Sequence, residues 1–391
     1  MTKKIDLIVK NGSYVTHKKT IKGDIAIHQG KIYRVGNITD LKASKTIDAR
    51  GLHILPGAID TQVHFREPGN TDKEDLKSGS RAAVAGGITT VFDMPNNNPS
   101  MSTKTLFKKK LNGAKNRMFC NYAFYFGAEK NNTNEIKKME KEVGCCGIKV
   151  FVGVSTGTLI VSDYKDIKRI MKSTKKMISF HSEDQYELNK REKFIKRGDP
   201  KSHPKWRNES VCLICTKNLV KLANQTKKKI HILHITTAEE IELLNKNKKY
   251  VSYEVTPQHL VLSSPSCYDK LGTLAQMNPP IRSLRHNKRL RQALKNNEID
   301  IVGSDHAPHK LSEKKLEYPD SPSGMPGVQT LLPILLNEVS KKMISINNVV
   351  ELTSYNPINR FKIKNKGLIK EGYDADLTFV DMSKTKKISN K

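Results

Sequence analysis

Residues 55–69 read LPGAIDTQVHFREPG, and this stretch decides the fold. It begins within a short apolar run, residues 53–59, of the kind that makes a buried strand. On an extended chain alternate side chains share one face, so the polar residues that follow point the same way: Asp60, Gln62, His64 and Arg66. An imidazole and a guanidinium on one face indicate a cation site beside an anion-binding site. A buried strand followed by Pro-Gly is typical of a barrel strand that ends at a functional loop, and the simpler alternative is a polar edge strand with a solvated arginine.

The rest of the chain alternates short β-rich runs with amphipathic helical stretches, which is the pattern of βα units. With 391 residues the chain is long enough for one (β/α)8 barrel and a small accessory domain. We therefore predict a TIM-like barrel over residues 55–365, with a capping-box pattern at 71–74 starting a helix that runs to 85. The eight predicted strands lie near 54–64, 88–94, 117–128, 147–153, 177–183, 230–237, 251–257 and 299–306.

Both ends of the chain have a different character from the middle. Residues 1–54 read as short β segments that break at Gly or Asn, and the tail GLIKEGYDADLTFVD has the same alternation. We predict a small discontinuous β-sandwich built from residues 1–54 and 366–391, with the barrel inserted between its two parts.

Composition excludes several classes of protein. No apolar run approaches the roughly 18 residues that span a bilayer, and the N-terminus lacks a signal-peptide core, so we expect a cytoplasmic protein without a membrane partner. The six cysteines do not form a disulfide framework. Cys212 and Cys215 make a lone C-x-x-C within an apolar run, which favours buried thiols over a zinc knuckle or a redox pair.

The net charge of +30 raises the question of nucleic-acid binding. The lysines, however, form short scattered runs, as at 108–110, 227–229 and 248–249, with no nucleic-acid motif and little aromatic interleaving. Solvated helix faces explain them better, so we expect no specific nucleic-acid partner. The charge can also steer an anionic substrate toward the protein.

Residues that suit metal chemistry recur in or at the ends of the predicted strands: His64, Lys149, His181, His234 and Asp305. The carboxyl ends of the strands of a (β/α)8 barrel meet at one mouth, where active sites lie. Any one of these residues can be an ordinary core polar group, but the whole set predicts a single site. Lysine in a buried strand is costly unless it is paired or modified, and an ion pair with Asp305 is the alternative to modification.

The segment at 60–69 resembles the dihydroorotase branch of the amidohydrolase superfamily, in which it reads D-x-H-x-H-F-R-E-P-G. The departure is Gln62, which stands where the family has its first metal-binding histidine. The segment GIKVF at 147–151 resembles the one whose lysine becomes N6-carboxylated and bridges two metals. The resemblance implies one or two Zn²⁺ ions per chain. His181, His234 and carboxylated Lys149 would hold one ion. His64, Asp305 and the carbamate would hold the other, with Gln62 as a weak ligand.

The same resemblance assigns substrate-binding residues. Arg66 would clamp a ring carboxylate through a bidentate pair, the geometry that guanidinium favours. The other matching positions are Asn96 in DMPNNNP, Asn278 in NPPIR, His309 in GSDHAPH, and Ser323 with Gly324 in SPSGMPG. A second departure is Gln258 in TPQHL, where the family has a histidine, and neither it nor His259 receives a role.

The function that the resemblance implies is reversible cyclisation of N-carbamoyl-L-aspartate to L-dihydroorotate in pyrimidine (UMP) biosynthesis. A metal-bound hydroxide would attack the ring amide, and Asp305 would act as general base and then acid. The alternatives are another cyclic amidase, of the allantoinase or hydantoinase kind, and an inactive homologue that serves as a structural partner of aspartate transcarbamoylase. Gln62 favours the inactive homologue. The other site residues are intact and argue against it: His181, His234, Lys149 and Asp305. The expected partners are the small-molecule substrate, a second copy in a homodimer, and aspartate transcarbamoylase.

Overall fold

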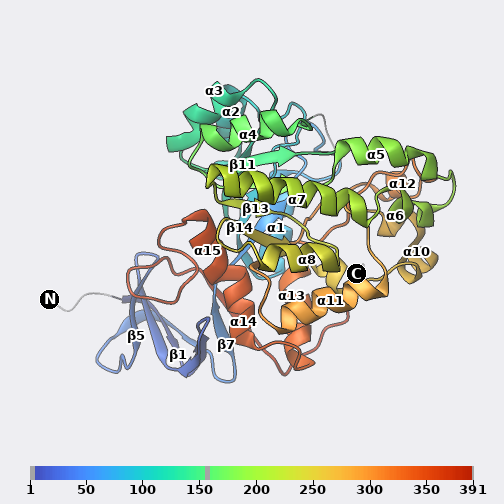
Figure 1. Cartoon of the computed structure of the whole chain (residues 1–391). Coiled ribbons are helices and arrows are strands. Elements are labelled where there is room, and N and C mark those ends of the chain that lie inside the picture. The colour runs from blue at the N-terminus through green and yellow to red at the C-terminus, as the bar shows by residue number, and fades with distance from the viewer. Residues whose placement is uncertain (1–4, 155–158, 390–391) are drawn as a thin grey trace.

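The structure, a computed structural model, describes residues 5–154 and 159–389 and is built around eight parallel strands (Figure 1). They pair in the order β15-β14-β13-β12-β11-β10-β9-β8. The sheet closes on itself because the N–H of His64 donates to the carbonyl of His306 at 2.7 Å, beside a parallel bridge from Val63. The predicted (β/α)8 barrel is thereby confirmed. Its strands are β8 (Ala58–Val63), β9 (Ile88–Asp93), β10 (Asn121–Gly127), β11 (Cys145–Phe151), β12 (Ile178–His181), β13 (Ile230–Ile232), β14 (Val251–Val255) and β15 (Ile301–Val302).

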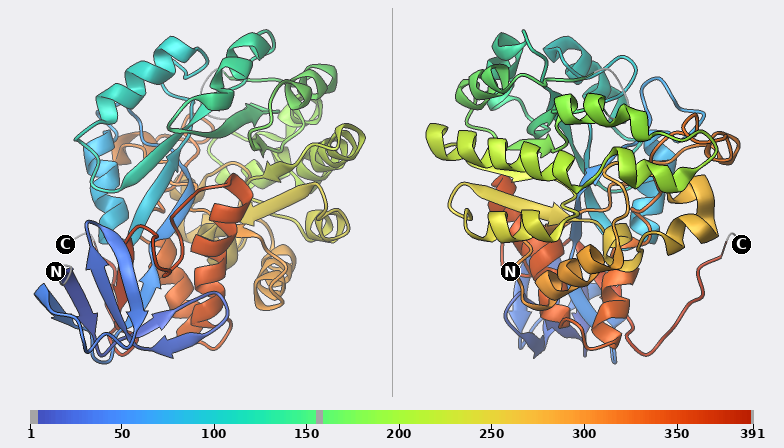
Figure 2. Two further views of the ribbon diagram at one scale, coloured as in Figure 1. Left: turned by 90° about the vertical axis from the view of Figure 1, so that its left-hand side faces the viewer. Right: turned by 45° about the vertical axis from the view of Figure 1, so that its right-hand side comes forward.

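Helices surround the barrel and cover its outer face (Figure 2). In β11, Ile148 and Val150 pack into the apolar core that the helices share with the strands, so Lys149 between them faces the barrel interior. In the described part of the chain, no helix is both long and apolar enough to cross a membrane. The helices are α1 (Leu76–Ala85), α2 (Lys104–Ala114), α3 (Thr133–Lys138), α4 (Tyr164–Ser173), α5 (Gln185–Arg191), α6 (His203–Trp206), α7 (Glu209–Thr226), α8 (Ala238–Asn245), α9 (Pro257–Val261), α10 (Ser266–Leu271), α11 (Leu284–Lys295), α12 (Leu311–Lys314), α13 (Leu331–Ser340), α14 (Ile346–Val350) and α15 (Asn356–Phe361).

The chain ends build two further four-stranded sheets that pack on each other (Figures 1 and 2). Val9 and Ile25 from the first sheet and Ile54 from the second share one apolar core, so the pair forms a β-sandwich. The first sheet has the order β5-β4-β1-β6 and the second β16-β7-β2-β3. Their strands are β1 (Ile5–Lys10), β2 (Ser13–Val15), β3 (Thr20–Lys22), β4 (Asp24–His28), β5 (Lys31–Gly36), β6 (Ala43–Asp48), β7 (His53–Pro56) and β16 (Leu377–Val380). Strand β7 crosses the boundary that we placed after residue 54 and leads directly into β8.

Two local expectations have different outcomes. The predicted capping box at 71–74 is wrong, because Asp75 caps α1 through the backbone N–H of Ser78, and the helix begins at Leu76. The carboxylate of Glu74 lies instead 2.9 Å from Nε2 of His306. The expectation of buried thiols is confirmed, since Cys212 and Cys215 are free and lie in the interior along α7.

Candidate active site

A small cavity of about 20 Å³ lies at the carboxyl ends of the barrel strands. This volume is enough for about one water molecule. The cavity brings together nearly all the residues that the sequence singled out. Its walls are formed by Gln62, His64, Arg66, Asn96, Lys149, Phe151, His181, His234, Asn278, Asp305, Ala307, Ser323 and Gly324.

His181 and His234 face each other across one side of the cavity, with Nδ1 of His181 3.0 Å from Nε2 of His234. Burial lowers the pKa of both imidazoles, so both rings are neutral near pH 7. Nε2 of His181 donates to Glu183 at 2.8 Å, and this bond leaves the lone pair of His181 on Nδ1, toward His234. A histidine whose far nitrogen is fixed by a carboxylate in this way is typical of a metal ligand.

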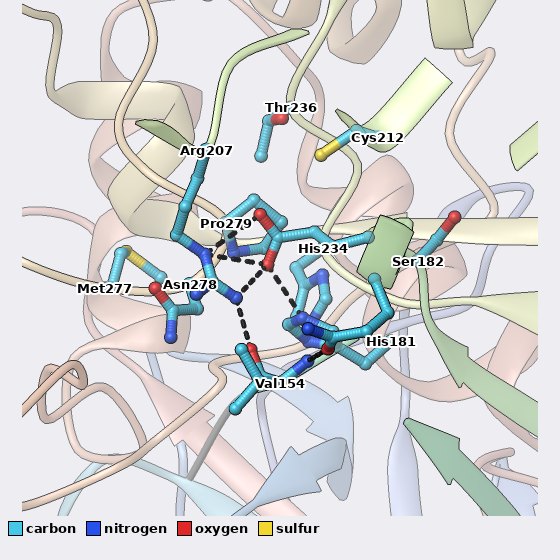
Figure 3. A network of polar contacts seen from close by, with 12 residues as sticks. Val154, His181, Ser182, Arg207, Cys212, His234, Thr236, Met277, Asn278 and Pro279 are labelled. Atoms are coloured by element: carbon cyan, nitrogen blue, oxygen red, sulfur yellow. Dashed lines mark hydrogen bonds and ion pairs between the residues drawn. The ribbon is translucent and has the colours of Figure 1, made fainter. Parts of the chain in front are cut away.

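A buried ion pair between Glu183 and Arg207 holds His181 in this arrangement (Figure 3). Arg207, which is 2 % exposed, donates to Glu183 from Nε at 3.1 Å and from Nη2 at 2.7 Å, and Nη2 also donates to the carbonyl of Val154. Burial favours the protonated form of Glu183, but the charge of Arg207 and the hydrogen bond from His181 outweigh it and hold the pKa of this carboxyl well below its usual range. Glu183 therefore stays ionised and keeps His181 in one tautomer.

Glu183→Ala is expected to lower the free energy of unfolding by about 3 to 5 kcal/mol, because it leaves the guanidinium of Arg207 buried without its counter-ion. Urea denaturation measures this change. The matched control is Glu187→Ala on α5, whose partner Lys190 is half exposed, and it should cost less than about 1 kcal/mol. Equal losses in the two variants would show that the Glu183–Arg207 pair is no stronger than a surface pair.

Asp305 forms the opposite side of the cavity. Its Oδ1 accepts a hydrogen bond from Nε2 of Gln62 at 2.7 Å and lies 3.2 Å from Nε2 of His64. Nδ1 of His64 is 2.8 Å from Oδ1 of Asn96, which accepts its proton. A neutral His64 then turns a lone pair toward the carboxylate of Asp305, and a cation near these two groups would stabilise the contact.

Lys149 lies between these groups and has no exposed surface. Within residues 5–154 and 159–389 its amine has no hydrogen-bond partner and no ion pair, so the alternative pairing with Asp305 is not formed. Burial lowers the pKa of Lys149 to about 7, although Asp305 and Glu254 oppose the shift. A buried polar atom without a partner is costly and marks a place where a further group belongs.

The donor set determines what could bind here. Over the described ranges, no three His, Cys, Asp or Glu side chains are grouped to hold a metal ion by themselves. Two other polar atoms of the cavity residues, Oε1 of Gln62 and Nδ1 of His234, also lack partners among the described residues. A metal would fit the cavity if Lys149 became an anionic ligand, because neutral imidazole and carboxylate are the donors that zinc prefers.

Two of these residues have an unusual backbone conformation. His234 has φ 40° and Asp305 has φ 47°, both in the left-handed region that non-glycine residues rarely adopt. Each such residue costs on the order of 1–3 kcal/mol and is typical of functional sites, where the surrounding structure holds it in place. Both residues lie just beyond the ends of their strands, β13 and β15.

One corner of the cavity, where we expect an anion to bind, is centred on Arg66, which is 5 % exposed. Its Nε donates to the carbonyl of Pro308 at 3.0 Å, which fixes the plane of the guanidinium. The cavity wall, as far as the described residues form it, does not include His309. This histidine lies behind Arg66, with Nε2 3.2 Å from Nη2 of the arginine, so the structure places it as a neighbour of Arg66. Asn278 lines the cavity, and its Oδ1 is 3.0 Å from Nε2 of His203.

Sequence reasoning missed Glu183 and Arg207. Glu183 carried a usable signal, because it follows His181 by two positions at the end of the same strand. Arg207 carried none, since it lies in the connection between α6 and α7, 24 residues from its partner.

Comparisons with known proteins identify the family of the chain. The family model of the amidohydrolase family matches residues 53–390. The dihydroorotase of Methanosphaera stadtmanae is 33% identical, over 98% of this chain and 85% of that protein. The dihydroorotase of Pyrococcus horikoshii is 37% identical, over 97% of this chain and 83% of that protein. The solved structure of the L-hydantoinase (dihydropyrimidinase) from Arthrobacter aurescens is similar, with a TM-score of 0.91 and 27% identity over 95% of this chain and 86% of that one. With a match over most of its length, the chain belongs to the amidohydrolase family.

Proposed function

We propose that this protein is a dihydroorotase, which interconverts N-carbamoyl-L-aspartate and L-dihydroorotate in pyrimidine biosynthesis. The observation that carries the proposal is one cavity that holds Arg66 at one corner and the His181–His234 pair, Lys149 and Asp305 around the rest. The similar archaeal proteins carry this name, and the hydantoinase of similar fold supports action on a cyclic amide. A cytoplasmic location, a homodimer and association with aspartate transcarbamoylase stay predictions from the sequence.

We assign a divalent metal, zinc, to the cavity. His181, His234 and carboxylated Lys149 would hold one ion, and His64, Asp305 and Gln62 would contribute to a second. When bound, the metal would supply Lewis acidity that activates water near neutral pH and polarises the carbonyl. The unpartnered polar atoms of Lys149, Gln62 and His234 support this assignment.

Carboxylation of Lys149 explains how a buried lysine can serve as a ligand. The neutral amine adds to carbon dioxide, a C–N bond forms, and one proton leaves to solvent, so the side chain becomes an anionic carbamate. The reaction needs a neutral amine, and a pKa of about 7 leaves a large fraction of Lys149 neutral at physiological pH. The modification also gives the buried nitrogen and its new oxygens partners in the cavity.

The remaining steps belong to side chains of this chain. In the hydrolytic direction, Asp305 takes a proton from the attacking water and delivers it to the leaving ring nitrogen. Arg66 and Asn96 bind the ring carboxylate, together with Asn278. The backbone at Ser323 and Gly324 holds the ring amide. Cyclisation is the same path in reverse, so the same groups serve both directions.

Arg66→Ala tests the choice of substrate. It is expected to lower kcat/KM for dihydroorotate by about 10²- to 10³-fold, because a desolvated charge pair with the ring carboxylate is lost. Hydrolysis of an uncharged hydantoin ring should stay low in both proteins. The matched control is Arg285→Ala, an exposed arginine paired with Glu239, which should leave kcat/KM unchanged.

Other results would favour the alternatives. Turnover of uncharged rings with indifference to Arg66→Ala would assign the protein to the other cyclic amidases. Bound metal without turnover of any ring, in protein purified without chelator, would favour an inactive homologue.

A further inference from the structure

We propose that Lys73 is a positioning residue of the anion-binding corner. By donating a hydrogen bond to Nδ1 of His309, it holds this histidine in the tautomer that carries its proton on Nε2. That tautomer binds the carbonyl of Ser323 and leaves Nη2 of Arg66 free for a substrate carboxylate. The inference rests on the proposed function, which supplies the carboxylate.

The imidazole of His309 is buried and has three polar neighbours. The side chain is 2 % exposed, so its ring nitrogens depend on protein partners. Nζ of Lys73 lies 3.3 Å from Nδ1, while Nη2 of Arg66 and the carbonyl of Ser323 lie 3.2 Å and 3.1 Å from Nε2. Lysine and arginine only donate hydrogen bonds, the carbonyl only accepts, and a neutral imidazole accepts at one nitrogen alone.

One tautomer satisfies more of these contacts than the other. With the proton on Nε2, Lys73 donates to Nδ1 and Nε2 donates to Ser323, so two bonds form, and Nη2 of Arg66 faces this N–H without a bond to the ring. With the proton on Nδ1, Nε2 can accept only from Arg66, the carbonyl loses its donor, and two donors face each other at Lys73. Burial and the neighbouring charges of Arg66 and Lys73 lower the pKa of His309 to about 3, so the ring stays neutral in either case.

Lys73 is itself held in place. Its ammonium lies 3.0 Å from Oε1 of Glu313 in α12, and the lysine side chain is only 17% exposed. Because Glu313 fixes the ammonium at the edge of the corner, the tautomer of His309 is set before any substrate enters.

His309 packs closely against the loop formed by Ser323 and Gly324, so the position of its proton affects this loop. Gly324 follows Ser323 with φ 147°, and a Cβ there would lie 2.6 Å from the carbonyl oxygen of Ala307 and 3.0 Å from Cδ2 of His309. The loop therefore rests directly on the imidazole. A histidine that stops donating to Ser323 would release the backbone that we assign to the ring amide.

The test is Lys73→Met, which keeps the length of the side chain and removes both the charge and the donor. We expect KM for dihydroorotate to rise about tenfold while kcat stays within about twofold, because a charge-assisted hydrogen bond is lost at the binding corner and none at the reacting atoms. Lys73→Arg keeps a donor and should restore KM. Lys310→Met is the matched control, because Lys310 pairs with Asp72 at the surface, and it should change neither constant.

A second readout does not depend on turnover. In ¹⁵N-histidine-labelled protein, the resonances of His309, identified by their loss in His309→Gln, should show the proton on Nε2 in the wild type. In Lys73→Met they should show it on Nδ1. An unchanged tautomer would overturn the inference, and so would a switched tautomer with unchanged KM. If the wild type does not hydrolyse dihydroorotate, the proposed function fails, while the tautomer result still decides the role of Lys73 toward His309.

Discussion

Asp305→Asn is expected to reduce kcat for dihydroorotate hydrolysis by about 10³-fold, within the range that general acid–base catalysis contributes. The substitution keeps the shape of the side chain and its contact with Gln62, but an amide cannot take a proton from water near neutral pH. The same loss should appear in the cyclisation direction, because one group transfers the proton in both. Initial rates in the two directions measure the effect.

The fold of this variant must be intact for the result to count. Circular dichroism and urea denaturation serve as checks. Asp320→Asn, at an exposed aspartate paired with Arg197, is the matched control and should retain full activity. A loss of less than tenfold in well-folded Asp305→Asn would remove Asp305 from the proton-transfer step.

Lys149→Met is expected to abolish turnover and to lower the zinc content per chain. Methionine fills the space beside Phe151 but cannot take up carbon dioxide or bind zinc as an anion. Wild-type protein kept in bicarbonate should carry the additional mass of one carbon dioxide at Lys149. That modification should decrease as the pH falls through about 7, because the amine then becomes protonated.

Although Lys149→Met should lose activity, it should increase the free energy of unfolding of the metal-free protein. In the metal-free wild type the folded pKa of Lys149, about 7, lies below its unfolded value of 10.5, so folding releases a proton between these values. At pH 8 the cost is on the order of 3 kcal/mol, and it decreases as the pH rises toward 10.5. Metal-free Lys149→Met should therefore unfold at higher urea concentration than the metal-free wild type at pH 8, with a difference that decreases at higher pH.

A second buried lysine provides the control. Lys110 lies 2.6 Å from the carboxylate of Asp93, so Lys110→Met strands a buried charge and should destabilise the protein by about 3 to 5 kcal/mol. It should not change the zinc content per folded chain. If Lys149→Met instead retained its metal and its activity, the assignment of Lys149 as a ligand would be wrong.

The barrel could be predicted because its strands are continuous apolar runs that end in polar residues. Period-two alternation places Lys149 inside the barrel, and parallel strands bring His181 and Asp305 to the same mouth. These are local properties of the sequence combined with one rule of topology. They suffice for the residues around the cavity.

The parts that could not be predicted depend on contacts between distant segments. Glu74 looks like a capping residue in the sequence, but its carboxylate binds His306, which follows β15 and lies beside β8 where the barrel closes, and α1 starts later. The pairing of Arg207 with Glu183 cannot be predicted from the sequence, because it forms only when α7 packs on the barrel. The position of His309 behind Arg66 likewise follows from how two loops meet.

The pairing of β7 with β16 has a consequence for synthesis of the protein. In this sheet β7 lies between β2 and β16, and His53 pairs with Val380. One edge of β7 therefore has no partner until a strand more than 300 residues later in the sequence has been synthesised. During synthesis β2 and β7 emerge more than 300 residues before β16, the strand that completes their sheet. A chain broken before residue 377 would expose a bare strand edge beside β8, and such edges promote aggregation. The strand that leads into β8 therefore stays unpaired along one edge until β16 has been synthesised.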